Sequence, residues 1–383
     1  MNDGSDLVRA LTVGEPPPSR VDLPRAIRAG RRRERLRVAA VAGAAAVAVL
    51  ATAVVVNQSA GGSRGAPVTG VSVSPSPPAP RSTVAPPLGT CTLDDLDRPG
   101  VPTDTRDVVA DPTGRIIVVG SRTPASDQLI VKITDGVPQT IDRTGSVVAV
   151  NRSGDFVGFG ADGKGWLHRG GQFVTIPVPT GFERSVPVDL NDRGDVLLTL
   201  SSRESGQLGA VWSAERPDVL RFLEPPDGWH SFGVGIGEDG TVAGVLTQLP
   251  AQFRMEPAAW LPDGTLRRLP VPEGSNGAIQ SINGEWVVAS GLRWNLRTGA
   301  VDRLEGIVAK HADQYGRLFG LGGTTDFYRP AVWVNGTVSL LPADPERTAG
   351  DIDWVGDDGT RLTGTLNTLG APNVRRVMWT CTG

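Results

Sequence analysis

The stretch Val150-Asn151-Arg152-Ser153-Gly154-Asp155-Phe156-Val157-Gly158 decides the fold, because its polar turn followed by an apolar run returns along the rest of the chain. The turn consists of Asp, Asn or Gly, two further residues, and Gly. Copies stand at Asp111–Gly114, Asn151–Gly154, Asn191–Gly194, Gly237–Gly240, a contracted Asn283–Gly284, Asp313–Gly316 and Gly356–Gly359. Repeats spaced by roughly 30 to 46 residues are too small to bury their own apolar faces, so they indicate a propeller or a solenoid.

A second repeated feature is an apolar strand centred on Trp, about 15 to 25 residues after each turn. Lys132 takes this place in the first unit, and the others have Trp166, Trp212, Trp260, Trp294, Trp333 and Trp379. Period-two runs such as Ile116–Gly120, Gly171–Pro177 and Gly336–Pro342 supply further strands. Four strands per unit form the blade of a β-propeller. We therefore predict an all-β fold, a single seven-bladed propeller of four-stranded antiparallel blades over residues 89–383. Six or eight blades and a stacked β-helix are the alternatives.

The last unit ends directly after its Trp strand and so lacks a fourth strand. Residues 89–100 precede the first complete unit and can supply it, because a propeller must close to leave no open edges. We predict that residues 90–97 pair with residues 374–381, which brings the chain's two cysteines, Cys91 and Cys381, face to face. Two cysteines in an exported domain favour a disulfide over free thiols.

The N-terminal part is read as a membrane anchor. Residues 38–56 form an uncharged apolar run long enough to cross about 30 Å of hydrocarbon. The basic run Arg31–Arg37 precedes it, so the positive-inside rule places residues 1–37 in the cytosol and the C-terminal domain outside. The alternative is a secretion signal cleaved near Ala51-Thr52-Ala53. Residues 57–88, rich in Pro, Ser and Gly and free of aromatic residues, are predicted to be a disordered linker.

The charge distribution excludes nucleic acid as a partner. Residues 1–37 hold nine Arg against five acidic residues, a net charge of +4. Because the whole chain has a net charge of −3, the rest of it carries −7. Phosphate backbones need a basic face, which such an exterior domain does not offer. Three Lys beside 35 Arg, with abundant Ala, Gly, Pro and Val, are typical of a GC-rich bacterial genome such as that of an actinomycete.

The repeats resemble the HAF-type extracellular repeat family, whose units read Ile-Asn-x-x-Gly-x-Val-Val-Gly and later His-Ala-Phe-x-Trp-x-x-Gly. The matching residues are Val150–Gly154 with Val157-Gly158, Pro257-Ala258-Ala259-Trp260, and Pro330-Ala331-Val332-Trp333 with Gly336. Pro or another residue replaces the His of the family signature, so this copy is divergent. The resemblance extends over nearly all of residues 107–383 and implies a surface-exposed propeller without implying a reaction.

The sequence offers no motif for catalysis, metal or cofactor binding. His168, His230 and His311 have no second His or Cys at metal-ligand spacing, which excludes a zinc site and a Cys/His nucleophile. No nucleophile elbow, phosphate loop or dinucleotide fingerprint occurs. The acidic pairs Glu238-Asp239 and Asp357-Asp358 are interpreted as turn residues. The in-frame Trp residues are interpreted as core between blades rather than a carbohydrate platform.

Position in the repeat points to a candidate ligand site. The innermost strand of each blade should precede the turn, and its last residue is always apolar, as expected of the core. One place earlier the residues are mixed, as expected of a wall facing a channel: Val109, Ala149, Asp189, Gly235, Ser281, His311 and Trp354. The candidate ligand-contacting ring is Asp189, Ser281, His311 and Trp354, with Lys310 and Asp353 beside it. Trp229 and His230, in a loop outside the repeat phase, are a second candidate contact. Solvated channel lining and loop packing are the respective alternatives.

These observations favour a membrane-anchored binding or interaction module, not an enzyme, that meets an extracellular protein or glycan. One alternative is transmembrane signalling through a cytosolic regulator held by residues 1–37, a layout that resembles transmembrane anti-sigma factors. The other is an exported polysaccharide-active enzyme, which would need several carboxylates about 5 to 10 Å apart at the channel mouth.

Overall fold

The computed structural model describes residues 85–96, 107–120, 129–202, 206–248, 254–324, 327–347, 349–368 and 374–382. All of them belong to one of two compact units, Gly62–Gly383. The predicted cytosolic segment 1–37 and membrane helix 38–56 lie outside the described residues, as does most of the predicted linker. Within the described ranges no helix has the length and apolar character needed to cross a membrane.

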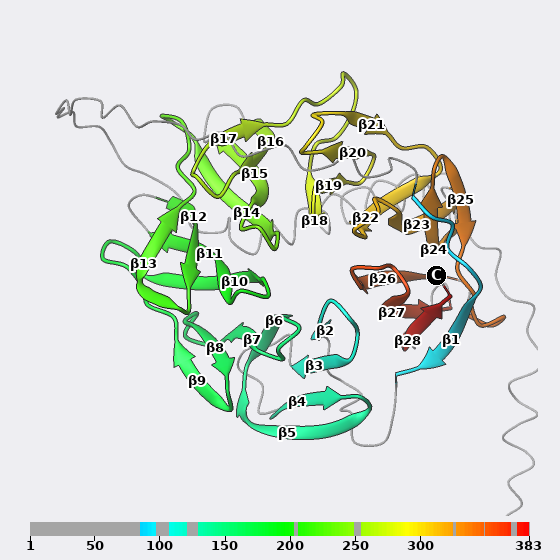
Figure 1. The fold of residues 1–383 in the computed structure, drawn as a ribbon, viewed down its shortest axis with the longest axis horizontal. Helices are drawn as coiled ribbons and strands as arrows, with labels where there is room; N and C mark the ends of the chain where they lie inside the picture. Colours follow the sequence, from blue (N-terminus) through cyan, green and yellow to red (C-terminus); the bar gives the residue numbers. More distant parts are fainter. Residues whose placement is uncertain are drawn as a thin grey trace, which may run out of the picture. The chain divides into compact units, whose positions relative to one another are not determined.

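The strands form seven four-stranded antiparallel sheets set radially about one axis (Figure 1). The first blade contains β2 (Asp107–Ala110), β3 (Ile116–Gly120), β4 (Leu129–Thr134) and β5 (Val137–Thr144). The second contains β6 (Ser146–Val150), β7 (Phe156–Phe159), β8 (Gly165–Arg169) and β9 (Gln172–Thr175). The third contains β10 (Arg184–Leu190), β11 (Asp195–Ser202), β12 (Gly206–Ser213) and β13 (Arg216–Phe222). The fourth contains β14 (His230–Ile236), β15 (Val242–Gln248), β16 (Arg254–Trp260) and β17 (Leu266–Arg268).

The remaining three blades complete the ring. The fifth contains β18 (Ile279–Asn283), β19 (Trp286–Ala289), β20 (Leu292–Asn295) and β21 (Val301–Arg303). The sixth contains β22 (Ile307–Ala312), β23 (Leu318–Thr324), β24 (Phe327–Val334) and β25 (Thr337–Leu340). The seventh contains β26 (Ala349–Val355), β27 (Arg361–Asn367), β28 (Val374–Cys381) and β1 (Cys91–Asp95). The predicted seven-bladed propeller is therefore confirmed, and the alternatives of six blades, eight blades and a β-helix are excluded.

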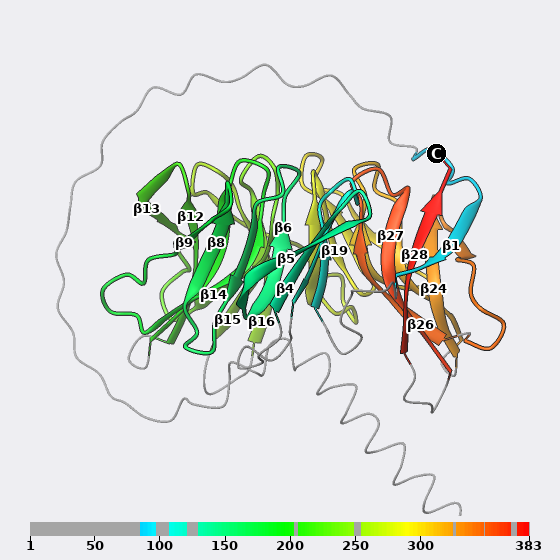
Figure 2. The same cartoon turned by 90° about the horizontal axis from the view of Figure 1, so that it is seen from below.

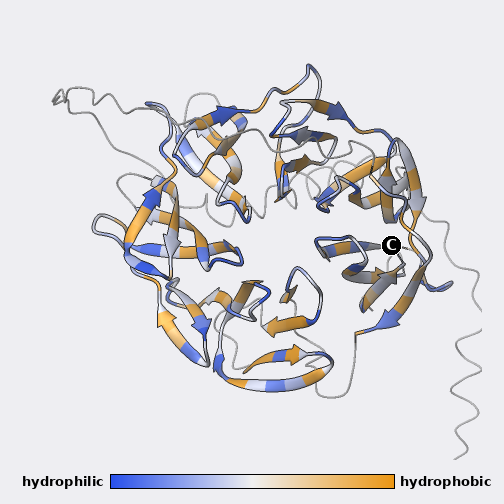
Figure 3. Cartoon of the chain, viewed as in Figure 1, coloured by the Kyte–Doolittle hydropathy of each residue, from blue (hydrophilic) through white to orange (hydrophobic). Residues whose placement is uncertain are grey.

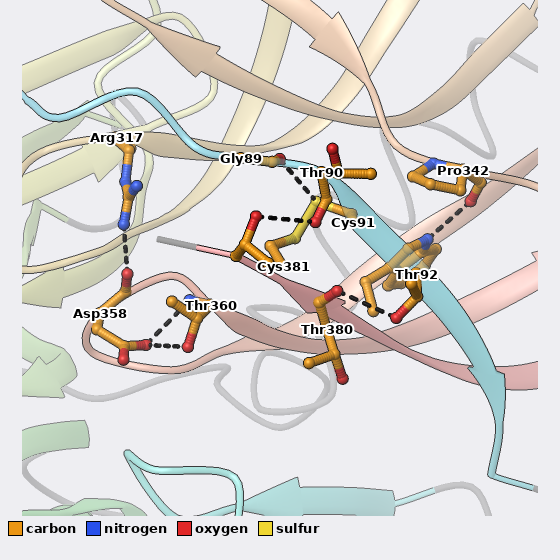
Figure 4. The surroundings of a disulfide bond; sticks show 12 residues. Gly89, Thr90, Cys91, Thr92, Arg317, Pro342, Asp358, Thr360, Thr380 and Cys381 are labelled. Atoms are coloured by element: carbon orange, nitrogen blue, oxygen red, sulfur yellow. Dashed lines mark hydrogen bonds between the residues drawn. A yellow bond between two sulfur atoms is a disulfide. The ribbon is translucent and has the colours of Figure 1, made fainter.

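The ring closes as predicted, in the seventh blade. β1 pairs antiparallel with β28 from Cys91↔Cys381 to Asp95↔Val377, and β28 continues to β27 and β26. Cys91 and Cys381 form a disulfide across this seam (Figure 4). One blade thus combines the two ends of the globular part, so no sheet edge is left open at the junction.

The described residues begin at residue 85, inside the predicted linker 57–88. Ala85 is buried, and its carbonyl accepts a hydrogen bond from Asn335 Nδ2 at 3.1 Å. Gly89 donates its N–H to the Thr382 carbonyl at 2.7 Å. These contacts hold the segment before β1 against the turn between β24 and β25 and against the residue that follows β28 (Figure 2).

The turn motif has a physical basis at its first and last positions. Gly154 donates its N–H to the Asn151 carbonyl at 2.9 Å and adopts φ 78°, a conformation that favours Gly. Asn151 Oδ1 accepts the N–H of Asp155 at 3.0 Å, which caps the start of the next strand. Its Nδ2 donates to the Asn191 carbonyl of the following blade at 3.2 Å. The first residue of the motif therefore both shapes its own turn and ties neighbouring blades together.

The in-frame Trp residues lie on the third strand of their blades and are core, as predicted. Each is at most 8 % exposed, and hydrophobic residues concentrate inside the sheets while the turns at the inner ends of the blades are hydrophilic (Figure 3). Several indole N–H groups reach a backbone carbonyl, as between Trp294 and Pro270 at 2.7 Å and between Trp379 and Pro342 at 2.7 Å. Burial of both the rings and their polar groups excludes these side chains as an exposed carbohydrate platform.

The innermost strands carry a feature that the repeat pattern did not predict. In six of the blades, the pairing of the first strand with the second shifts register by one residue, three places before the turn. The bulged residues are Val148, Val188, Val234, Gln280, Lys310 and Asp353. A bulge bends the strand and redirects the side chains beside it. The predicted ring positions directly follow these bulges.

Candidate functional site

The four predicted ring residues line one cavity. Asp189, Ser281, His311 and Trp354 come from the ends of β10, β18, β22 and β26, and residues of all seven blades complete a cavity of about 240 Å³. The apolar residue that follows each ring position is buried, as predicted, in every blade except the fifth, where Ile282 is half-buried. Sequence position thus identified the wall of a cavity on the channel axis.

Asp189 presents a carboxylate that has no cationic partner among the described residues. Its two oxygens accept backbone N–H groups, Oδ1 from Leu190 at 2.8 Å and Oδ2 from Ile236 of the next blade at 2.9 Å. Burial raises the pKa of Asp189 to about 6, although both N–H groups favour the ionised form. At neutral pH the residue is therefore an anion held at the cavity wall by backbone dipoles.

His311 is neutral in the same cavity at neutral pH. Burial and, to a smaller extent, the neighbouring Lys310 ammonium lower the pKa of His311 to about 4. The Asp351 carboxylate and a hydrogen bond to the Ile352 backbone act in the opposite direction without restoring the ordinary value. Lys310 itself does not line the cavity, because its ammonium forms an ion pair with Asp351 between the sixth and seventh blades. Asp353, the other residue predicted beside the ring, does line the cavity.

The mouth of the cavity, on the turn side, is crossed by an ion pair. Arg152 of the second blade pairs with Asp192 of the third at 2.7 Å and also with Asp357 of the seventh. Asp357 accepts a further hydrogen bond from Asn283 Nδ2 of the fifth blade at 3.3 Å. The contacts through Arg152, Asp357 and Asn283 thus connect three non-adjacent blades across the channel.

Glu238 adds a second carboxylate at the mouth. Its Oε2 accepts the Asp192 N–H at 3.0 Å. Desolvation and the nearby Asp192 carboxylate raise the pKa of Glu238 to about 7, and Asp357 adds to the same effect. Burial likewise raises the pKa of Asp357. The mouth is therefore crowded with carboxyl groups: Arg152 pairs with Asp192 and Asp357, and Glu238 is about half protonated at neutral pH.

Sequence reasoning did not assign Glu238 and Asp357 to the site, because both stand in acidic pairs that were interpreted as turn residues. That interpretation is confirmed for the second member of each pair. Asp239 accepts the N–H and hydroxyl of Thr241, and Asp358 does the same for Thr360. The first member of each pair lines the cavity instead. Their place in the repeat could have identified them, since both residues directly follow the first position of the turn.

Trp229 and His230 are not brought together with the ring. Trp229 is half-buried beside two guanidinium groups, with Arg254 and Arg268 at 5.7 and 5.3 Å from its ring centroid. Both arginines pair with Glu256, at 2.6 and 2.8 Å. These three charged residues line a second, open cavity of about 470 Å³. Trp229 and His230 therefore lie apart from the channel cavity, and His230 is the first residue of β14 instead of the loop residue that was predicted.

The described residues contain no group of three His, Cys, Asp or Glu side chains placed to hold a metal ion. At the cavity, Asp189 and Glu238 accept backbone N–H groups, and Asp357 pairs with Arg152. What the arrangement can do chemically is attract positive charge and donate or accept hydrogen bonds in a confined space.

No family model and no curated protein matches this chain. Among solved structures, the chain is similar to an oligogalacturonate lyase in complex with manganese, at 10% identity over 78% of this chain and 98% of that one, with a TM-score of 0.50. It is also similar to the β-propeller domain of the Trilobed protease from Pyrococcus furiosus, at 11% identity over 72% and 94% of the two chains, with a TM-score of 0.47. A gluconolactonase from Xanthomonas campestris matches at 15% identity over 78% and 98%, with a TM-score of 0.40.

Similarity at these identities concerns the fold alone. It agrees with the seven four-stranded antiparallel blades seen in the sheet topology. The neighbours include enzymes, and their activities are properties of those proteins. Membership of the HAF-type extracellular repeat family stays a prediction, and what the comparisons and the topology together establish for this chain is a seven-bladed β-propeller closed by its own two ends.

Proposed function

We propose that this protein is a non-catalytic binding module that holds a small ligand in its channel cavity. The observation that carries the proposal is the convergence of Asp189, Ser281, His311 and Trp354 on one cavity of about 240 Å³. Concave sites that combine an apolar wall with a few directed polar groups are the usual form of ligand sites. The repeat positions supply both, because apolar and polar ring residues face the same space.

The size of the cavity favours a small ligand over a polymer. Pockets for drug-sized molecules occupy roughly 300–1,000 Å³, which exceeds the volume available here. The contacts from Arg152 to Asp357 and from Asp357 to Asn283 also cross the mouth, so an extended polysaccharide chain has no open groove to follow at this face. A binding role is therefore preferred to the exported polysaccharide-active enzyme, although four carboxylate residues line the space.

The proposal is tested by filling the cavity. Ala149 is half-buried at its wall, so Ala149→Phe places a ring inside it, whereas Val174→Phe adds the same ring on the exposed outer strand β9 of the same blade. We expect a small-molecule screen on the full chain, purified in detergent, to give ligands that raise the unfolding temperature. Their effect should be lost in Ala149→Phe, because the ligand stabilises only the state that binds it.

Val174→Phe should keep the effect of every such ligand, which controls for the added ring. Both variants must unfold cooperatively without ligand, so that loss of binding is not loss of fold. Ligands that still stabilise Ala149→Phe would place the binding site outside the channel. A screen without any stabilising ligand would also contradict the proposal.

We further propose that residues 38–56 anchor the propeller at the outer surface of the cell membrane, with residues 57–84 as linker and residues 1–37 available to a cytosolic regulator. The resemblance to an extracellular repeat family and the disulfide support an exported domain. We expect the full chain to stay in the membrane pellet after a high-salt wash and to lose its propeller to protease added outside the cell. Deletion of residues 38–56 should move it to the soluble fraction.

Sequencing the N-terminus of the mature protein separates the anchor from a cleaved signal. An intact N-terminus agrees with the anchor. A mature chain that begins shortly after Ala53, found free in the medium, would show that the segment is a secretion signal.

A further inference from the structure

The cavity wall is chemically divided. Its first and second blades contribute only apolar side chains from their innermost strands, Val108, Val109, Val148 and Ala149. The third, fifth, sixth and seventh blades contribute Asp189, Ser281, His311 and Asp353. A ligand that matches this wall has an apolar part for the first and second blades and a polar part for the other blades.

The charge on the polar side has one sign. Among the described residues no Lys or Arg lines the cavity, whereas four acidic residues do: Asp189, Glu238, Asp353 and Asp357. Arg152 at the mouth offsets part of this charge, through its pairs with Asp192 and Asp357. His311 is neutral near pH 7 and contributes no positive charge there. The deep part of the cavity, at Asp189, therefore has a negative potential that a cationic ligand would neutralise.

Two further features point to an organic ligand. The Ser281 hydroxyl is buried and has no hydrogen-bond partner among the described residues, so the wall keeps an unused donor and acceptor. Trp354 offers an indole beside the acidic residues, and aromatic faces attract ammonium groups. An inorganic cation would need several oxygen ligands at once, and the described residues present no such group of three.

We propose that the channel cavity binds a small organic ammonium ion whose charged group lies toward Asp189 and whose apolar part lies against Val109 and Ala149. This inference rests on the proposed function, because it names the ligand class of the same cavity. The ammonium would donate hydrogen bonds to carboxylate oxygens that already hold backbone N–H groups in place. The apolar wall would exclude water from the rest of the ligand, which strengthens the charge interaction.

The test compares three probes of similar shape on the full chain, purified in detergent: phenethylammonium, 2-phenylethanol and 3-phenylpropanoate. Isothermal titration calorimetry should show that the ammonium binds at least about tenfold more tightly than the alcohol or the carboxylate, a factor that one well-placed charge interaction provides. Asp189→Asn should reduce the ammonium affinity at least about fivefold and leave the alcohol nearly unchanged.

Asp218→Asn is the matched control, because Asp218 lies exposed on β13, in the same blade as Asp189. It removes the same charge from the protein without touching the cavity, so the ammonium affinity should not change. Asp353→Asn is a second cavity variant, which keeps the test decisive if Asp189→Asn does not fold. It should also weaken the ammonium selectively.

Three results would overturn the inference. They are equal binding of the alcohol or the carboxylate, an ammonium affinity unaffected by both cavity variants, and ammonium binding weaker than about 10 mM. Ala149→Phe then separates the two proposals. If it abolishes binding of an uncharged or anionic probe, the channel is a binding site for another ligand class. If every probe binds Ala149→Phe as well as the native chain, the channel proposal itself fails.

Discussion

Replacement of both Cys91 and Cys381 by Ser is expected to lower the free energy of unfolding of the propeller by about 3–5 kcal/mol. The disulfide closes a loop with a sequence separation of 290 residues, so it removes a large share of the conformational freedom of the unfolded chain. It also holds β1 on β28, the single place where the two ends of the ring meet. Without it, the first and last blades depend on hydrogen bonds and packing alone.

Urea unfolding followed by Trp fluorescence measures this loss, since six Trp residues lie on third strands and are at most 8 % exposed. A reducing agent should destabilise the native protein toward the level of the Cys91→Ser/Cys381→Ser variant and should leave that variant unchanged. Equal effects of the reducing agent on both proteins would show that the stabilisation does not come from the disulfide. Unchanged stability of the variant would show that strand pairing alone closes the ring.

The sequence predicted those parts of the fold that the repeated turns and strands determine. Asn151 and Gly154 stand in a turn that needs a side-chain acceptor at its start and a positive φ at its end, and both requirements are visible as residue types. The closing strand followed from counting, because a ring of four-stranded blades cannot leave the last blade with three. The pairing Cys91↔Cys381 is the consequence.

The bulges and the contacts across the channel could not be read from the sequence. A bulge such as that at Asp353 arises from the bend of an innermost strand and leaves no residue type in common, since Val, Gln, Lys and Asp occupy the same place. The ion pair of Arg152 with Asp357 joins residues about 200 positions apart. Both directly follow the first position of their turn, but this shared position does not tell which blades come into contact across the channel. Such contacts depend on ring diameter and side-chain reach, which only the assembled blades define.

For the candidate site, too, the sequence predicted one part correctly and another part wrongly. The repeat phase identified Asp189, Ser281, His311 and Trp354 as one wall, because each precedes its turn by the same distance. It assigned Trp229 to a second contact only because that residue lies outside the phase, and the structure places it beside Arg254 and Arg268 instead. The residue outside the repeat phase lies away from the channel axis, whereas the four residues at the same place in the repeat lie around it.

Substitution of Arg317 is the second change with a large expected effect. Arg317 is 1% exposed, and its guanidinium pairs with Asp313, which is fully buried. It also donates to the backbone carbonyl of Asp358 in the seventh blade (Figure 4). A further bond to the Pro86 carbonyl connects it to the segment before β1. Arg317→Met leaves the Asp313 carboxylate buried without a counter-charge. We expect a loss of about 3–5 kcal/mol in the free energy of unfolding, measured by urea titration at pH 7.

Arg115→Met is the matched control, because Arg115 occupies the same place in the first blade's repeat, four residues after Asp111. Arg115 pairs with Asp135 at 2.8 Å, but the two side chains are 62% and 55% exposed. Solvent screens such a pair, so its loss should cost far less than the loss of the buried pair of Arg317. Equal costs for the two substitutions would contradict the argument that burial of the charge, rather than the ion pair as such, sets the size of the effect.

The double variant Asp313→Asn/Arg317→Met decides between charge and contact as the cause. Asn already opens the turns of the second and third blades, where Nδ2 of Asn151 and of Asn191 donates to the next blade's turn carbonyl. Asn at position 313 can make the same bond toward Gly356, and it removes the buried charge. If the uncompensated carboxylate causes the loss, the double variant should recover at least half of it. If the lost contacts to Pro86 and Asp358 cause it, the double variant should be as unstable as Arg317→Met alone.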